Sequence, residues 1–287
     1  MRRTVTTLVL LISMLALATP ALALPMISAS ANTLPKGAFM VDTWFLYRDF
    51  SRAYVDDLHG DDEGGWEDLP PGTGVTAVDF VPRLYYGVTD WFTMRASVPL
   101  TFREVDFDPD GSGNSAIGLG DIVLDPKIQV YRGEGGYPRL ALLTGVMLPT
   151  GDADADPALS DGSVDFLAGF AATDRMDDAQ AHLCVTYWWN GEAESGADVK
   201  DMLIASACIE NPLDTYWTLL WEAKAYIGET PDEFKRYYIC PGIAWDNGHH
   251  FTIGLSAMVG ITGTGGGGIS WLDFEWAPHV RAYYRFF

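Results

Sequence analysis

Basic residues are scarce in this chain. Only 18 Lys and Arg residues stand against 39 Asp and Glu residues, and the formal net charge over 287 residues is −21. Proteins that bind nucleic acid neutralise its phosphates with clusters of basic side chains, and the sequence contains no such cluster. The composition therefore excludes a nucleic-acid partner.

Long apolar runs are also absent, except at the start of the chain. The basic pair Arg2-Arg3 precedes an apolar run over residues 8–18 that a single serine interrupts, and small residues follow up to Ala23. This order predicts a cleavable signal peptide over 1–23, with cleavage after Ala31 as the alternative. A membrane anchor is the weaker interpretation, because about 20 apolar residues are needed to span a bilayer. Residues 24–36 would then form an N-terminal periplasmic segment.

Cysteine is rare as well. The chain has three, Cys184, Cys208 and Cys240, and no two of them have the spacing of metal ligands. The small odd number argues against a disulfide framework. We interpret the three as small side chains that fill a wall, with a disulfide between neighbouring strands as the alternative.

The rest of the chain is rich in apolar and aromatic residues, at 48% and 13%. These residues alternate with polar ones in segments about 9–11 residues long or slightly longer, the length of a transmembrane β-strand. Twelve such segments are predicted, near residues 38–49, 75–86, 91–102, 118–131, 139–148, 164–173, 179–189, 201–210, 215–227, 236–245, 250–262 and 271–286.

The parity of the charged residues is the strongest pattern. In the last segment, the acidic and basic residues and the histidine all have odd numbers: Asp273, Glu275, His279, Arg281 and Arg285. Leu272, Phe274, Trp276, Val280, Tyr284 and Phe286 occupy even positions between them. Successive side chains of a strand point to opposite faces, so one face is charged and the other apolar. A charge facing lipid near the midplane costs about 2–4 kcal/mol, so the apolar face is predicted to meet lipid.

A soluble β-sandwich also alternates, but three features favour a barrel. The segments exceed the usual ~5–6 residues of globular strands, short connections alternate with long ones, and aromatics lie beside the short connections, as at residues 85–92, 216–217 and 245. The prediction is an all-β protein of the bacterial outer membrane. Residues 37–287 would form a closed antiparallel transmembrane β-barrel of about twelve strands, with short periplasmic turns and long acidic outer loops.

The charged face supplies the candidates for a pore lining. Twelve groups are predicted to face the lumen: Asp79, Arg83, Arg95, Asp121, Asp125, Lys127, Glu222, Lys224, Arg236, Asp273, Glu275 and Arg281. A barrel of about twelve strands is intermediate between a packed interior and an aqueous channel. Two interpretations stay open, a narrow polar pore and a plug of paired charges.

Acidic residues concentrate in the long connections, where solvation of an open loop is the simplest interpretation. Two clusters could instead bind a divalent cation weakly: Asp106, Asp108 and Asp110, and Asp152, Asp154 and Asp156. The first begins like a calcium loop, but Ile117 stands where the final Glu is needed. We expect no cofactor beyond Ca²⁺ or Mg²⁺ held weakly at these loops.

No catalytic motif stands out. His182 and Ser206 lie on strands predicted to be adjacent, but no Gly-x-Ser-x-Gly surrounds the serine. We therefore expect no enzymatic activity.

Several segments resemble a known family. Tyr85–Phe92, Gly118–Lys127 and Leu143–Asp152, together with the opening Leu34–Gly37, are similar to segments of the MetA-pathway of phenol degradation family. The resemblance covers roughly residues 34–152. It implies an outer-membrane barrel that helps aromatic or other hydrophobic compounds to enter, and it transfers no catalytic residues.

The sequence thus predicts a porin-like outer-membrane protein for transport of small, aromatic or hydrophobic solutes. The alternative is a non-conducting structural or surface-interaction barrel whose acidic loops bind cations. The expected partners are outer-membrane lipid, lipopolysaccharide and the solute, and the expected state is a monomer.

Overall fold

The structure is a computed structural model. It describes residues 25–26, 28–50, 52–55, 65–68, 73–107, 112–133, 136–193, 201–228, 235–248, 250–264, 272–273 and 276–286. The predicted signal peptide lies outside this part of the chain. No helix of the described residues is long and apolar enough to cross a membrane.

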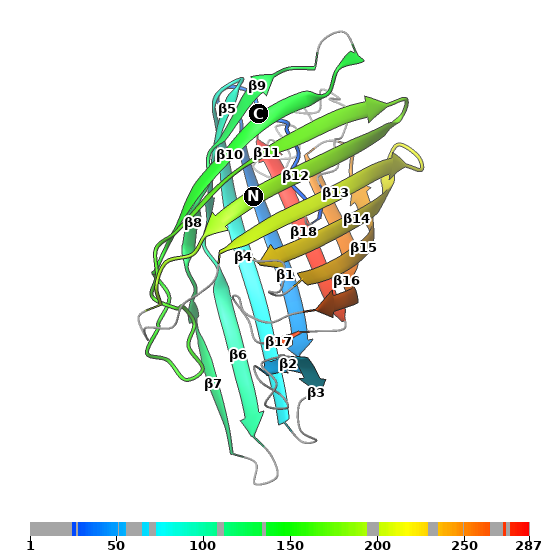
Figure 1. Cartoon of the computed structure of the whole chain (residues 1–287). Coiled ribbons are helices and arrows are strands. Elements are labelled where there is room, and N and C mark those ends of the chain that lie inside the picture. The colour runs from blue at the N-terminus through cyan, green and yellow to red at the C-terminus, as the bar shows by residue number, and fades with distance from the viewer. Residues whose placement is uncertain are drawn as a thin grey trace, which may run out of the picture.

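The described strands cross a closed antiparallel wall twelve times (Figure 1). Ten crossings are made by single strands: β1 (Phe39–Phe50), β4 (Thr73–Thr89), β10 (Arg139–Leu148), β11 (Asp165–Met176), β12 (Ala179–Trp189), β13 (Met202–Pro212), β14 (Trp217–Gly228), β15 (Lys235–Asp246), β16 (Phe251–Thr264) and β18 (Trp276–Phe286). The other two crossings are interrupted. One comprises β5 (Phe92–Ser97) and β6 (Leu100–Phe107), and the other comprises β7 (Ser112–Leu119), β8 (Ile122–Leu124) and β9 (Lys127–Tyr131).

The wall closes because its first and last strands pair. Strand β1 runs antiparallel to β18 from Phe39 opposite Phe286 to Leu46 opposite His279, and its other edge pairs with β4. Strand β5 joins β4 to β8 and β9, and these two strands join β10. Every barrel strand is thereby linked into one sheet, as a wall in lipid requires.

The two interrupted crossings correct the sequence-based boundaries. The segments predicted over 91–102 and 118–131 contain Pro99 and Pro126, which lack the N–H that a ladder needs, and the ladder breaks at each. Residues 103–117, between two predicted strands, were expected to form one of the long connections. Residues 103–107 and 112–117 instead belong to β6 and β7, which pair with each other and project together with β4 beyond the rest of the wall (Figure 1).

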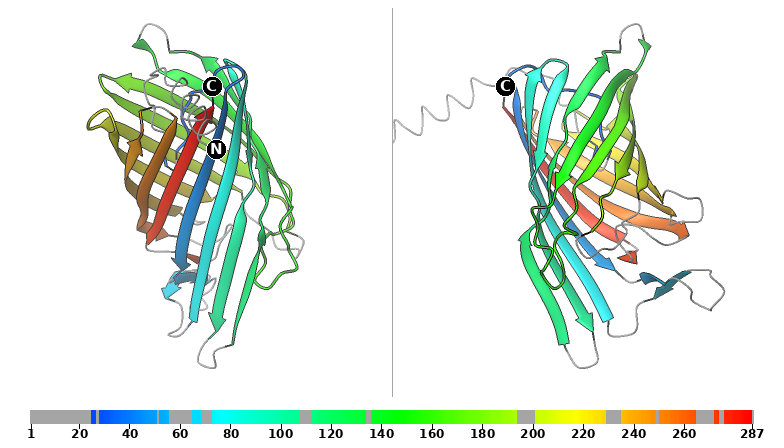
Figure 2. Two further views of the ribbon diagram at one scale, coloured as in Figure 1. Left: turned by 180° about the vertical axis from the view of Figure 1, so that it is seen from behind. Right: turned by 60° about the vertical axis from the view of Figure 1, so that its left-hand side comes forward.

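The start of the last strand is also corrected. It begins at Trp276 and not near 271. Asp273 belongs to β17 (Leu272–Asp273), which pairs with β2 (Arg52–Val55), and β2 pairs with β3 (Gly65–Asp68). This small separate sheet lies at the end of the barrel opposite the chain termini (Figure 2). Asp273 is therefore not in the barrel wall, because it pairs in the small sheet and the last strand of the wall begins only at Trp276.

The predicted faces are confirmed along the rest of the wall. In β18, Ala277, His279, Arg281, Tyr283 and Arg285 are buried, whereas the residues between them are half-buried or exposed. Phe286 points outward with 48% exposure, and Phe287 lies outside the described residues. The eighth predicted strand, 201–210, corresponds to β13. Asp201 precedes this strand, and Glu210 is buried on its inner face.

The two ends of the barrel differ as predicted. The chain termini of the barrel and the short connections, such as those after β4, β11, β13 and β15, lie at one end, and the longer connections lie at the other (Figures 1 and 2). Exposed aromatics accompany the short-turn end, at Tyr86, Trp91, Tyr216 and Trp217, and the far end, at Phe166, Trp189 and Trp276. Tyr85 is an exception, because its side chain is buried inside the barrel.

The assignment of the outer face to lipid can be tested by placing the same charge at two depths in the membrane. Leu255 in β16 and Leu213 in a short turn are 53% and 55% exposed. We expect Leu255→Arg to lower the free energy of unfolding by about 2–4 kcal/mol, because the charge faces lipid, and Leu213→Arg to lower it by about 0–1 kcal/mol at the interface. Urea unfolding in lipid vesicles measures both. Equal losses would contradict the assigned lipid face.

Candidate functional site: the barrel lumen

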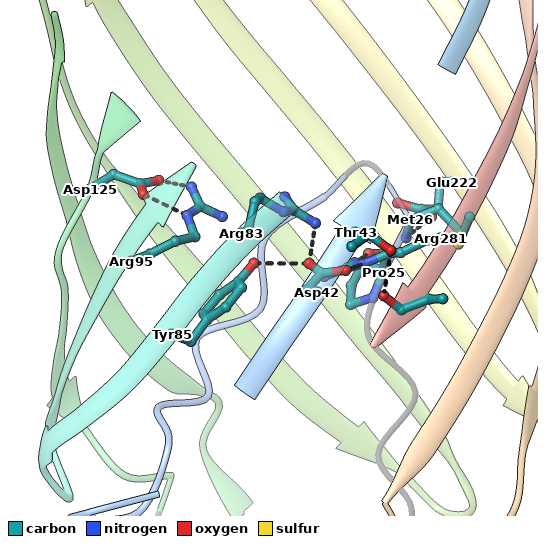
Figure 3. A network of polar contacts seen from close by, with 11 residues as sticks. Pro25, Met26, Asp42, Thr43, Arg83, Tyr85, Arg95, Asp125, Glu222 and Arg281 are labelled. Carbon is teal, nitrogen blue, oxygen red and sulfur yellow. Dashed lines mark hydrogen bonds and ion pairs between the residues drawn. The ribbon is translucent and has the colours of Figure 1, made fainter. Parts of the chain in front are cut away.

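Asp42 on β1 is the centre of a charge network inside the barrel (Figure 3). Its carboxylate is completely buried. Arg281 of β18 donates from Nε to Oδ1 over 3.0 Å and from Nη2 to Oδ2 over 2.9 Å, and Arg83 of β4 donates to Oδ2. The Tyr85 hydroxyl donates to the same oxygen over 3.3 Å. One carboxylate therefore ties the first strand to both of its neighbours.

Trp44 lies beside this network. It is two residues from Asp42 and shares its inward face. The guanidinium of Arg83 lies 3.6 Å from the centre of its ring, and that of Arg281 lies 5.6 Å away. Two arginines thus share one carboxylate and one indole ring, which stabilises their charges away from bulk water.

A second ion pair lies one strand farther along the wall, where β5 pairs with β4. Arg95 of β5 forms an ion pair with Asp125, which stands between β8 and β9. Asp79 of β4 pairs with Arg48 of β1 and accepts a hydrogen bond from Thr101 over 3.0 Å. These contacts join neighbouring strands across the inner face of the wall.

The N-terminal segment preceding β1 enters the lumen. The carboxylate of Glu222 on β14 accepts hydrogen bonds from the backbone N–H groups of Met26 and of Ser28, the latter over 2.9 Å. The carbonyl of Pro25 accepts from Arg281. Farther along, the Ala31 N–H donates to Thr173 over 2.8 Å. Residues expected on the periplasmic side therefore reach well into the barrel.

Two side chains of β9, Lys127 and Gln129, hold the same segment from another direction. Lys127 Nζ donates to the carbonyls of Ser30 and Asn32 over 2.6 and 3.1 Å, and Gln129 donates to the carbonyl of Ala31 over 3.1 Å. Almost all these contacts are made to the backbone of the segment. Sequence reasoning missed them because a backbone N–H or C=O carries no residue-specific signal.

A cavity of about 340 Å³ remains beside the segment. That volume falls in the range of about 300–1,000 Å³ typical of small-molecule sites. Its lining combines charged and apolar side chains. The charged ones are Arg83, Arg95, Asp125, Lys127, Lys224 and Arg281, and the larger apolar ones are Trp44, Val81, Leu143, Leu167, Trp188 and Ile204.

Among the described residues, the other side chains that the sequence predicted to face the lumen do not line this cavity. Asp79 and Glu222 face inward and bind Arg48 and the N-terminal segment, and Arg236 is buried on β15. Asp121 lies between β7 and β8, and Glu275 lies outside the described residues. A role for any of the twelve in passage of a solute stays a prediction.

Asp121 anchors the connection between β10 and β11. Its carboxylate accepts hydrogen bonds from the Gly151 N–H over 3.1 Å and from the Ser160 hydroxyl over 2.9 Å. Among the described strands β7 pairs only with β6, and Arg103 of β6 donates to the carbonyl of Ala158. Residues 149–163 thus pack against the part of the wall where strand pairing is incomplete.

The described residues contain no assembled cation site at the two predicted acidic clusters. Nowhere among them do three Asp, Glu, His or Cys side chains gather as metal ligands. Asp156 instead accepts a hydrogen bond from Asn114 over 2.5 Å, and Asp152 accepts from the Asp154 N–H over 3.0 Å. Asp106 is exposed. Asp108 and Asp110 lie outside the described residues, so calcium or magnesium binding stays a prediction.

His182 does not meet Ser206. Its direct cross-strand partner in β13 is Cys208, whereas Ser206 stands opposite Cys184. The His182 ring instead lies 2.9 Å from the Thr173 hydroxyl and 3.1 Å from Glu210, and all three are buried. Because that hydroxyl accepts the Ala31 N–H, the set positions the N-terminal segment. All three cysteines are free and buried.

Comparison with known proteins was made at two levels. Residues 61–271, more than half of the chain, match the family described as Putative MetA-pathway of phenol degradation. The chain belongs to this family. The match extends well beyond the segments that carried the resemblance in sequence, and together with the closed barrel it places the protein in the bacterial outer membrane. A comparison with curated proteins finds no match.

Solved structures support the fold. An outer membrane channel from Pseudomonas putida F1 is similar with a TM-score of 0.70 and 15% identity, covering 89% of this chain and 98% of that one. The translocator domain of the autotransporter NalP from Neisseria meningitidis is similar with a TM-score of 0.52 and 9% identity, covering 88% of this chain and 90% of that one. At these identities the likeness concerns the barrel fold alone.

The central charge network can be tested with Asp42→Asn. The amide cannot neutralise Arg83 and Arg281, and breaking a buried ion pair costs about 3–5 kcal/mol. We expect a loss of this size in the free energy of unfolding, measured by urea titration in vesicles. Asp49→Asn, on the exposed side of the same strand, is the matched control. An equal effect of both substitutions would refute the structural role of the network.

Proposed function

We propose that this protein is a channel for small hydrophobic solutes across the outer membrane. The observation that carries the proposal is the cavity of about 340 Å³ inside a closed barrel, with apolar and polar side chains on one lining. A structural barrel gains nothing from an unfilled, partly apolar space in its interior. Membership of the family supports the proposal.

The N-terminal segment would control how wide the passage is. It is held by hydrogen bonds to polar side chains of the wall, namely Glu222, Lys127, Gln129, Thr173 and Arg281. Met26 and Ala31 also pack against apolar side chains of the wall. The hydrogen bonds can be exchanged for water when the segment moves, whereas the apolar packing holds it in place. The same observation favours a second candidate, a non-conducting barrel in which the segment is a permanent plug. Conductance across a planar bilayer separates the two.

We expect removal of residues 25–31 to raise single-channel conductance several-fold, because the segment fills lumen space that an intermediate-sized barrel would otherwise leave to water. Glu222→Gln, which weakens the contacts to Met26 and Ser28 and leaves those to Lys127 and Thr173 in place, should raise it less. Folding of both variants is checked by the heat-dependent gel shift typical of barrels. A folded deletion variant without any conductance would overturn the channel proposal and favour the structural barrel.

We also propose that signal cleavage follows Ala23 and not Ala31. Cleavage after Ala31 would remove five residues whose backbone atoms bind the lumen wall: Pro25, Met26, Ser28, Ser30 and Ala31. Cleavage after Ala23 keeps them. Mass spectrometry of the protein purified from outer membranes should therefore find Leu24 at the amino terminus. A chain beginning at Asn32 would show that the segment is not part of the mature lumen.

A further inference from the structure

The cavity in the lumen is lined by an excess of positive charge. Five cationic side chains line it, Arg83, Arg95, Lys127, Lys224 and Arg281, against the single carboxylate of Asp125. This is the reverse of the whole chain, whose formal net charge is −21. The local excess therefore does not follow from composition.

Each of the three arginines forms an ion pair with a carboxylate. Arg95 pairs with Asp125, and Arg83 and Arg281 share Asp42 behind the lining. The two lysines differ. Neither Lys127 nor Lys224 forms an ion pair with a carboxylate in the part of the chain that the structure describes.

Each lysine has only uncharged neighbours as direct partners. Lys127 Nζ donates to the carbonyls of Ser30 and Asn32, and Lys224 Nζ lies 4.6 Å from the centre of the Tyr226 ring. An ammonium group has three donors. Both therefore retain the capacity to bind an anion in the cavity, where the local dielectric makes such a bond stronger than in water.

The same cavity offers apolar surface to the rest of a ligand. Trp44, Leu143, Leu167, Trp188 and Ile204 contribute to its lining. A fully hydrated inorganic anion would make poor use of these side chains. A small molecule with one carboxylate on an aromatic or aliphatic body would use both parts of the lining.

We infer that the lumen cavity selects small apolar monocarboxylates, with Lys127 and Lys224 as the residues that determine specificity. The inference rests on the proposed channel function and names the class of solute for the same site. The formal net charge of −21 repels anions at long range, so we assign the preference for a carboxylate to the lysines inside. An uncharged solute of equal size would fill the cavity without engaging them.

The test compares benzoate with benzyl alcohol, which carries the same ring without a negative charge. Both are titrated calorimetrically into the full-length folded protein in detergent. We expect benzoate to bind at least about tenfold more tightly, since hydrogen bonds to ionised groups are roughly twice as strong as neutral ones. Lys224→Met and Lys127→Met should each lower benzoate affinity about tenfold and leave benzyl alcohol affinity unchanged.

Two matched variants control the charge. Lys36→Met removes the same charge from an exposed position outside the cavity and should leave benzoate affinity unchanged. Lys224→Arg keeps the charge and should keep the preference for benzoate. The wild-type comparison is decisive even if a methionine variant fails to fold: benzoate binding no tighter than benzyl alcohol overturns the inference.

Uptake into vesicles separates this inference from the channel proposal. If benzyl alcohol and benzoate enter protein-containing vesicles equally fast, and faster than they enter empty ones, the channel stands and the selectivity is refuted. If neither enters faster than into empty vesicles, the channel proposal itself fails.

Discussion

The exclusion of charge from the lipid face is the constraint on which the rest of this structure depends. A charge at the midplane of the outer face costs about 2–4 kcal/mol, and Asp42, Arg83, Glu222 and Arg281 accordingly lie buried on the inner face. There a charge leaves bulk water and needs a partner. Asp42 meets this need for both Arg83 and Arg281, and in doing so it joins the two edges of β1 to their neighbours.

The same constraint explains why the lumen can bind a segment of the chain itself. Inward-facing charged side chains accept hydrogen bonds from backbone N–H groups or donate them to backbone carbonyls. Glu222 accepts from Met26 and Ser28, and Lys127 donates to Ser30 and Asn32. The segment therefore supplies hydrogen-bond partners to charges on the wall, and the cavity is the space that the segment leaves unfilled beside them.

Predicting strands from the alternation of apolar and polar residues failed where a property other than side-chain polarity decided the structure. Pro99 and Pro126 interrupt the ladder because they lack an N–H, although the side chains around them keep the two-residue period. Residues 103–117 were expected to form a long connection, yet beyond the lipid a paired hairpin needs no apolar face. Asp273 kept the parity of the last strand and nevertheless belongs to a separate sheet, because parity says nothing about which sheet a residue joins.

By itself the sequence determined that the fold is a barrel and on which face each residue of a regular strand lies. It also predicted that the chain is exported. The barrel and the faces of its strands follow from periodicity and from the cost of charge in lipid, which are local and additive along the strand. Only the tertiary structure decided which charges meet, that residues 25–34 enter the lumen, and that Lys127 and Lys224 border a cavity without a carboxylate partner among the described residues. These depend on closure of the wall, which brings together residues nearly 200 positions apart.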